Sequence, residues 1–301
     1  MWTLLAFCSA ALLGVYDVCK KKSLHANAVI PVLLLNTLFS SLIFLPFILL
    51  SAGGVLSADS LFYVERVGWS VHRLVFFKSL LVLSSWMLGY FAIKHLPLTL
   101  VGPVNATRPV LVLLGALVFF SEKLNLYQWI GVSLTIFSFF LLSRSGRKEG
   151  IDFRQNKWVL FLVLATLLGS ASGLFDKYMI HSSGISPMVV QSWYNIYQLA
   201  EMLMVLIFLW LPHRQKTTPF VWRWTIPLIS VFICAADFAY FYALSCDGAL
   251  IAVVSMIRRG SVIVSFGFGA LLFHEKNLRN KAVDLGFVLL GMVFLFLGGR
   301  Q

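Results

Sequence analysis

The chain has 301 residues, of which 59% are hydrophobic and 12% are charged, and it carries a formal net charge of +12. A soluble domain is about half apolar and about a quarter charged, so this composition excludes an ordinary water-soluble fold and makes lipid the expected solvent. The excess of Lys and Arg does not indicate nucleic-acid binding, because these residues lie between apolar stretches and no separate basic domain carries them.

Ten apolar stretches follow one another along the chain, each near the roughly 20 residues that a helix needs to cross the hydrocarbon core. Backbone polar groups cannot remain unpaired in lipid, so these spans must be helices. The first stretch lacks a basic region and a cleavage site, which predicts a retained helix rather than a signal peptide. The predicted fold is an all-α integral membrane protein with transmembrane helices over 2–20, 29–51, 74–95, 98–121, 126–143, 157–180, 187–211, 225–246, 249–273 and 280–298.

The two halves of the chain are similar in sequence. The segment GYFAIKHLPLTLVGPVNATRPV (89–110) aligns without gaps on AYFYALSCDGALIAVVSMIRRG (239–260), and GVYD (14–17) corresponds to GLFD (173–176). The polar segment after the fifth helix divides the chain into a five-helix repeat over 1–145, a connector over 146–156 and a second five-helix repeat over 157–301. Repeats with an odd number of spans insert with opposite topology, which predicts an inverted repeat with a binding site near the membrane midplane.

This layout resembles the drug/metabolite transporter superfamily, specifically its ten-helix EamA-type members. The resemblance is carried by Pro109, by Gly131 and Gly286, and by the endings GALVFFSEKL (115–124) and GALLFHEKNL (269–278). It covers essentially the whole chain and implies a central cavity, lined mainly by the first four helices of each half, and transport by alternating access. The second half departs from the pattern at Arg259, the repeat partner of Pro109, so the resemblance does not support a kink in the ninth helix.

The orientation in the membrane is indicated in two opposing ways. The resemblance implies that both termini lie in the cytoplasm. The Lys and Arg residues of the connections and helix ends, with Lys20, Lys78 and Lys281 among them, fall predominantly on the side opposite the termini. The positive-inside rule therefore favours termini outside, and we give this rule slightly more weight.

Three arginines lie near the middle of predicted helices. Arg108 is in the fourth helix, and Arg258 and Arg259 are in the ninth. An Arg at the bilayer centre costs roughly 2.5–3.5 kcal/mol on insertion scales, so it must face a cavity or a partner. We expect Arg108 and Arg258 to hold an anionic substrate group from opposite sides, with Arg259 pointing about 100° away from Arg258. The alternative is that each arginine is paired with an internal carboxylate and braces the bundle.

Four acidic residues lie within the predicted spans: Asp17, Asp176, Glu201 and Asp237. Desolvation makes such carboxyl groups candidates for proton coupling, and we consider Asp17, Asp176 and Glu201 as coupling residues. For Asp237, substrate binding and an ion pair with an arginine are equally supported. For Asp17 and Asp176, local ion pairs with Lys20 and Lys177 are the simpler interpretation.

Aromatic residues supply further candidates for the cavity wall. Trp86 and Tyr90 share a face of the third helix, and Tyr240 is the repeat partner of Tyr90. Trp193 of the seventh helix fits an interfacial aromatic belt better than a cavity.

Polar side chains complete the predicted substrate site. Asn105 shares a helix face with Arg108, and its repeat partner is Ser255. Gln198 projects from an unusually polar stretch of the seventh helix. By contrast, the stripe formed by Ala165, Gly169 and Gly173 predicts close helix packing and no role in chemistry.

The combined features predict a secondary transporter for a small polar or amphiphilic metabolite of the amino acid or organic anion class. The alternative is an intramembrane enzyme acting on lipid headgroups, but six scattered histidines and four cysteines without CxxC spacing give it no metal site or base. We expect no cofactor and no ATP-binding loop. The predicted partners are the substrate, the bilayer of the plasma membrane and a proton or another coupling ion, with the chain a monomer or a homodimer.

Overall fold

The fold is seen in a computed structural model, which describes residues 2–112, 114, 125–147, 151, 153, 155–246, 254, 257–272 and 278–298. The described residues are helices and their connections, without a β-strand among them. Much of the GALVFFSEKL and GALLFHEKNL endings lies outside these ranges, as do residues 148–150, 152 and 154 of the predicted connector.

The helices follow the predicted order. Apolar stretches of sufficient length form them, and most predicted bounds agree with the structure to within a few residues. The helices of the first half are α1 (Trp2–Leu24), α2 (Val29–Ala52), α3 (Trp69–His95), α4 (Leu98–Ala106) and α6 (Leu126–Arg147). Those of the second half are α7 (Lys157–Lys177), α8 (Pro187–Val205), α9 (Thr225–Ser245), α11 (Ser261–Leu272) and α12 (Leu278–Gly298). Helices α7 and α8 continue into π-helical turns, η1 (Tyr178–Ser182) and η2 (Leu206–Trp210), and η2 leads into the 3₁₀-helix η3 (Leu211–Lys216).

Two helices that were predicted as continuous are interrupted near their middles. The fourth breaks at Thr107, between α4 and the helical residues 108–112, and the ninth breaks at Gly260, immediately before α11. Pro109 has no N–H to bind the carbonyl group four residues earlier, and Gly260 is a poor helix former. The second interruption therefore forms without the proline that stands at the aligned position of the first half, and the ninth helix is interrupted although the resemblance did not support a kink there.

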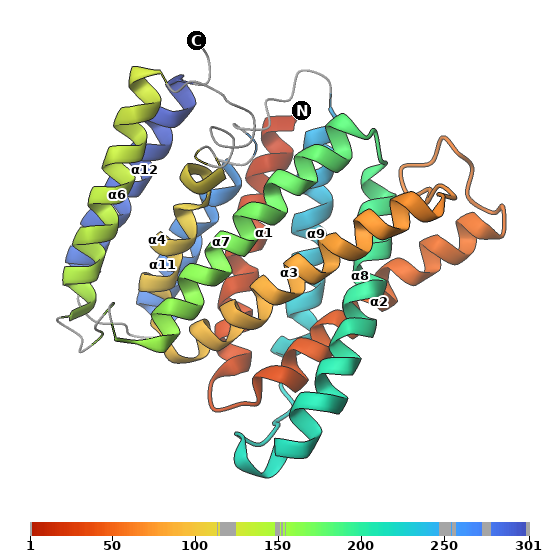
Figure 1. Cartoon of the computed structure of the whole chain (residues 1–301), viewed down its shortest axis with the longest axis horizontal. Helices are drawn as coiled ribbons and strands as arrows, with labels where there is room; N and C mark the ends of the chain where they lie inside the picture. Colours follow the sequence, from red (N-terminus) through yellow and green to blue (C-terminus); the bar gives the residue numbers. More distant parts are fainter. Residues whose placement is uncertain are drawn as a thin grey trace.

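The helices pack in cross-half pairs. Helix α1 packs on α9, α3 on α7, α2 on α8, α4 on α11 and α6 on α12. In Figure 1 the pair α6 and α12 stands at one side of the bundle, next to α4 and α11, while the other six helices form the larger part. Hydrogen bonds between the halves join these pairs at buried positions, from Ser9 to the Ala236 carbonyl (2.6 Å) and from Ser85 to the Ala165 carbonyl (2.7 Å).

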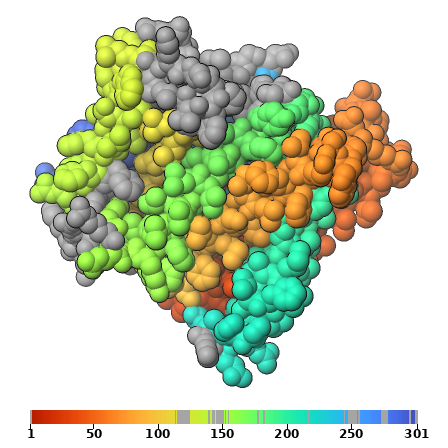
Figure 2. Space-filling model, viewed as in Figure 1, coloured from red at the N-terminus to blue at the C-terminus, as the bar shows by residue number. Residues whose placement is uncertain are grey.

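The outer surface of the bundle is apolar. Within the described residues, seven helices are long and apolar enough to span a membrane: α1, α2, α3, α7 with part of η1, α8 with its extension, α9 and α12. Large apolar side chains point outward on several of them, for example Phe7, Phe77 and Phe208, which are 62%, 52% and 71% exposed. Figure 2 shows one such face, where α3 (orange) runs between α7 (green) and α8 (teal). Soluble proteins rarely expose so much apolar surface to water. Together with the seven candidate spans, this surface shows that the chain is an integral membrane protein.

Candidate functional site

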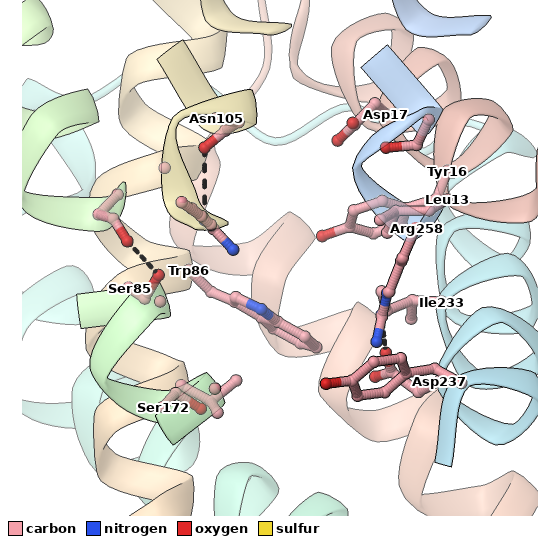
Figure 3. Close-up of a pocket in the computed structure, with 18 of the residues that line it drawn as sticks. Leu13, Tyr16, Asp17, Ser85, Trp86, Asn105, Ser172, Ile233, Asp237 and Arg258 are labelled. Atoms are coloured by element: carbon pink, nitrogen blue, oxygen red, sulfur yellow. Dashed lines mark hydrogen bonds and ion pairs between the residues drawn. The ribbon is translucent and has the colours of Figure 1, made fainter. Parts of the chain in front are cut away.

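A central cavity of about 170 Å³ lies between the two halves of the bundle. Its wall comes from α1, α3, α4, α7, α8, α9 and α11, together with the helical residues just after α4 and just before α11. Figure 3 shows Ser85, Trp86, Asn105 and Ser172 on one side, and Tyr16, Asp17, Asp237 and Arg258 on the other. The cavity therefore lies where helices from both halves of the chain meet.

The lining contains eight charged side chains, five cationic and three anionic. Each carboxylate has a cation as its partner. Asp17 pairs with Lys20 at 2.9 Å, Asp176 of α7 pairs with Lys78 of α3, and Asp237 of α9 pairs with Arg258. Charges removed from water require such partners.

Aromatic rings support the cations of these pairs. Lys20 Nζ lies 4.2 Å from the centre of the Tyr16 ring, and the Arg258 guanidinium lies 4.2 Å from the centre of the Tyr240 ring. A cation over an aromatic face is attracted by the ring quadrupole. The Tyr194 hydroxyl donates a hydrogen bond of 2.8 Å to the second oxygen of Asp237, so both oxygens of this carboxylate are engaged.

The remaining two cations of the cavity are Arg108 and Arg259. Within the described part of the chain, neither has a carboxylate at ion-pair distance. Arg108 donates a hydrogen bond of 3.3 Å to Asn105 Oδ1, and its Nε has no hydrogen-bond partner among the described residues. The cavity wall therefore carries an excess of two positive charges.

The Arg108 guanidinium packs closely against Gly169 of α7. A Cβ atom placed on Gly169 would lie 2.6 Å from Arg108 Cζ and 2.7 Å from one of its terminal nitrogens. The small-residue stripe was predicted to serve helix packing alone, but at Gly169 the close neighbour is this charged group. Only the absence of a side chain at residue 169 lets Arg108 adopt its observed position.

The structure brings most of the predicted site residues together. Nine of them line the central cavity: Asp17, Trp86, Tyr90, Asn105, Arg108, Asp176, Asp237, Tyr240 and Arg258. Asp17 has the local partner that was expected, Lys20, whereas Asp176 forms its ion pair with Lys78 of another helix. The sequence could not identify this second pair because it depends on how α3 and α7 pack.

Three predicted site residues do not line the described cavity. Ser255 lies outside the described residues. Gln198 is fully buried but one helical turn beyond Tyr194, which does line the cavity, so a rise of about 6 Å along α8 removes it from the wall. Glu201 lies further along the same helix, buried against Ser79 of α3.

Sequence reasoning also missed several cavity residues. Lys20 and Lys78 were counted among the charges of connections and helix ends, but both are buried and line the cavity. Arg259 was expected to point away from the site, yet it lines the cavity together with Arg258. Successive helical side chains diverge by about 100°, so a cavity lined by both must wrap around this helix end. The one indication of this role in the sequence was the alignment of Arg108-Pro109 with Arg258-Arg259, which places Arg259 beside a predicted site residue.

The described residues contain no group of three or more His, Cys, Asp or Glu side chains that could hold a metal ion. The cavity lining itself offers charged, hydrogen-bonding and aromatic side chains.

Comparison with known proteins supports the resemblance drawn from the sequence. The model of the EamA-like transporter family matches residues 1–144. Among solved structures, a protein crystal structure with 15% sequence identity superposes with a TM-score of 0.66 and covers 99% of this chain and 98% of its own. At that identity the likeness shows the fold alone. No curated protein matches the sequence.

Proposed function

We propose, from the membership of residues 1–144 in the EamA-like transporter family, that this chain is a membrane carrier for a small organic anion. The family is one of transporters, which favours a carrier over the alternative of an intramembrane enzyme. The observation that carries the substrate class is the charge of the central cavity, where three carboxylates are matched by three cations and Arg108 and Arg259 remain. An anion would neutralise this excess.

An organic anion suits the cavity better than a zwitterion. An amino acid needs an anionic partner for its ammonium group, but each described carboxylate of the lining already has a cation. Guanidinium groups present paired donors that match carboxylate or phosphate oxygens. Trp86 and Tyr240 offer apolar surface for the remainder of such a substrate.

The proposed mechanism is alternating access by an inverted repeat of ten helices in the plasma membrane. The cross-half pairing supports it, because exchanging each helix with its repeat partner returns the same five pairs. A site at the interface of two inverted repeats can open to either side when one repeat rocks against the other. The helices are interrupted at Thr107 and Gly260, next to Arg108 and Arg259. This irregular backbone beside the cavity is compatible with the proposed mechanism.

A thermal-shift screen tests the substrate class. Purified protein is heated with succinate, glycerol 3-phosphate, glutamate, glucose or spermidine, and a compound that binds the native state raises its melting temperature by mass action. We expect succinate or glycerol 3-phosphate to stabilise the wild type, and glucose and spermidine to have no effect.

Variants of the two arginines locate the effect. Arg108→Ala and Arg259→Ala should each remain folded and lose the response to anions, whereas Arg73→Ala, at an exposed position of α3, should respond as the wild type does. Stabilisation by spermidine, or an anion response that survives in both cavity variants, would contradict the proposal.

A further inference from the structure

Outside the central cavity, one buried acidic residue has no cationic partner among the described residues. Glu201 of α8 is 5% exposed, and within the described residues no Lys, Arg or His lies at ion-pair distance from it. Its Oε1 contacts the hydroxyl group of Ser79, and its Oε2 is buried without a described hydrogen-bond partner. A buried carboxylate without a cation is strongly disfavoured, so this group must be neutral or must bind a cation from solution.

The contacts of Ser79 favour the neutral form of Glu201. Ser79 Oγ lies 2.7 Å from the carbonyl oxygen of Phe76 and also contacts Glu201 Oε1. A serine hydroxyl has one proton, while a carbonyl group and an ionised carboxylate only accept. Both contacts are full hydrogen bonds if Glu201 is a carboxylic acid that donates to Ser79, which then donates to Phe76, whereas with an ionised Glu201 the two acceptors would share the single Ser79 proton.

Within the described residues, the helices packed against α8 place no cation at ion-pair distance from Glu201. Helix α2 and the turn η2 contain no ionisable side chain. Helix α9 brings Asp237, whose oxygens are held by Arg258 and Tyr194. Helix α3 brings Lys78, which is paired with Asp176, and His72, whose Nδ1 is 2.9 Å from the Tyr197 hydroxyl.

A second unsatisfied polar side chain lies next to Glu201 on the buried face of α8. Gln198 is fully buried, and neither atom of its amide has a described hydrogen-bond partner. Residues three apart in a helix are neighbours on its surface. An amide can donate to a carboxylate and accept from a carboxylic acid, so Gln198 can serve both protonation states of Glu201.

We propose that Glu201, together with Ser79 and Gln198, is the site of a coupling proton, and this inference rests on the proposed carrier function. The proton binds the carboxylate from water on one side of the membrane and is released from the carboxylic acid to water on the other. Helix α3 joins this site to the substrate cavity, because Lys78 pairs with Asp176 in the cavity wall and the next residue, Ser79, contacts Glu201. A movement of α3 changes both sites together, which is the physical requirement for coupling.

The protonation of Glu201 is tested on purified protein by infrared spectroscopy. The wild type at neutral pH should show the carbonyl stretching band of a protonated carboxylic acid, and Glu201→Gln should lose it. Glu65→Gln, at an exposed position of the loop between α2 and α3, is the matched control and should keep the band. An unchanged band in Glu201→Gln would overturn the proposal.

Coupling is tested in proteoliposomes with labelled succinate and glycerol 3-phosphate as probes. Exchange is measured at equal pH on both sides, and accumulation is measured under an imposed pH gradient. Glu201→Gln should keep exchange and lose gradient-driven accumulation. A permanently neutral side chain allows the conformational change with substrate bound, but it cannot bind and release a proton. If Glu201→Gln does not fold, Ser79→Ala should weaken accumulation and alter the infrared band.

The outcomes separate this inference from the proposed function. A wild type that exchanges neither probe contradicts the carrier function and removes the coupling with it. Intact exchange with gradient-driven accumulation that is equal in wild type and Glu201→Gln contradicts the proton site alone.

Discussion

At the scale of single residues, some charged side chains of the cavity are engaged in ion pairs, whereas others keep hydrogen-bond donors for a ligand. One oxygen of Asp237 forms an ion pair with Arg258, and the other accepts a hydrogen bond from the Tyr194 hydroxyl. The side chains of Asp237 and Arg258 are each 12% exposed. Such a network holds α8, α9 and the Arg258 segment in one arrangement. Among the described residues, Arg108 donates one hydrogen bond, to Asn105, and its Nε has no partner, so its guanidinium keeps donors for a ligand.

Asp237→Asn should destabilise the protein. The substitution leaves Arg258 as an uncompensated buried charge, which typically costs about 3 kcal/mol or more. The melting temperature of purified protein should therefore fall clearly. Replacing both partners, as Asp237→Asn with Arg258→Met, should recover part of the loss, and a double variant less stable than the single one would contradict the assignment of this pair.

Gly169→Ala should weaken anion binding without unfolding the protein. The new methyl group meets the flexible end of Arg108 rather than backbone, so the guanidinium moves aside at little cost. Titration by thermal shift should show an affinity about tenfold lower, equivalent to about 1.4 kcal/mol. Gly286→Ala on α12 is the control, because residue 286 does not line the cavity and a Cβ there meets no described atom within 4 Å.

Residue-level prediction from the sequence succeeded where one helix carries the information. Asp17 and Lys20 are three residues apart, so their pairing follows from helical periodicity. Lys78 was misjudged because its partner, Asp176, is 98 residues away and reaches it only through the packing of α3 on α7. For the same reason, the sequence could not reveal which two of the three arginines would lack a carboxylate partner among the described residues.

At the scale of helices, the pair α6 and α12 is held by direct backbone approach. A Cβ atom on Gly291 of α12 would lie 2.9 Å from the carbonyl oxygen of Gly131 and 2.6 Å from Thr135 Oγ1 of α6. Ser138 adds a hydrogen bond of 2.6 Å to the carbonyl group of Asp284. In lipid the hydrophobic effect does not drive helices together, so close packing at small residues and hydrogen bonds between helices must stabilise the pair.

Gly291→Ala should separate these two helices. The methyl group meets backbone that cannot move aside, and overpacking of this kind costs about 1–3 kcal/mol. The variant should unfold at a lower temperature than the wild type. Gly286→Ala on the same helix meets no described atom within 4 Å, and equal stability of the two variants would show that the close approach is not limiting.

The sequence predicted the helices well because length and apolarity alone decide a membrane span. It predicted their interruptions less well. Pro109 marks one interruption, but Gly260 marks the other, and a glycine within a helix is a weaker signal than a proline. The extension of α3 to Trp69, five residues before its predicted start, places an exposed Trp at the helix end, where interfacial aromatic residues are common.

At the scale of the whole molecule, the distribution of basic residues predicts an orientation in the membrane. Lys20, Lys78 and Lys281 are buried, so they do not act on lipid headgroups, but removing them from the count leaves the excess on the side opposite the termini. The positive-inside rule still favours termini outside.

Labelling of introduced cysteines tests this orientation. In a variant without the four native cysteines, an impermeant maleimide added to intact cells should label Ser57→Cys, in the loop between α2 and α3, and not Thr217→Cys, in the loop before α9. Both positions are exposed. The reverse pattern would place the termini in the cytoplasm, as the EamA resemblance implies.

The most direct test of the central claim is counterflow of labelled succinate and glycerol 3-phosphate into proteoliposomes that are preloaded with the same unlabelled anion. A carrier with two available arginines should exchange at least one of these anions, and Arg108→Ala should abolish the exchange. Exchange of spermidine in place of the anions, or anion flux that is unchanged in Arg108→Ala, would contradict an anion carrier built around this cavity.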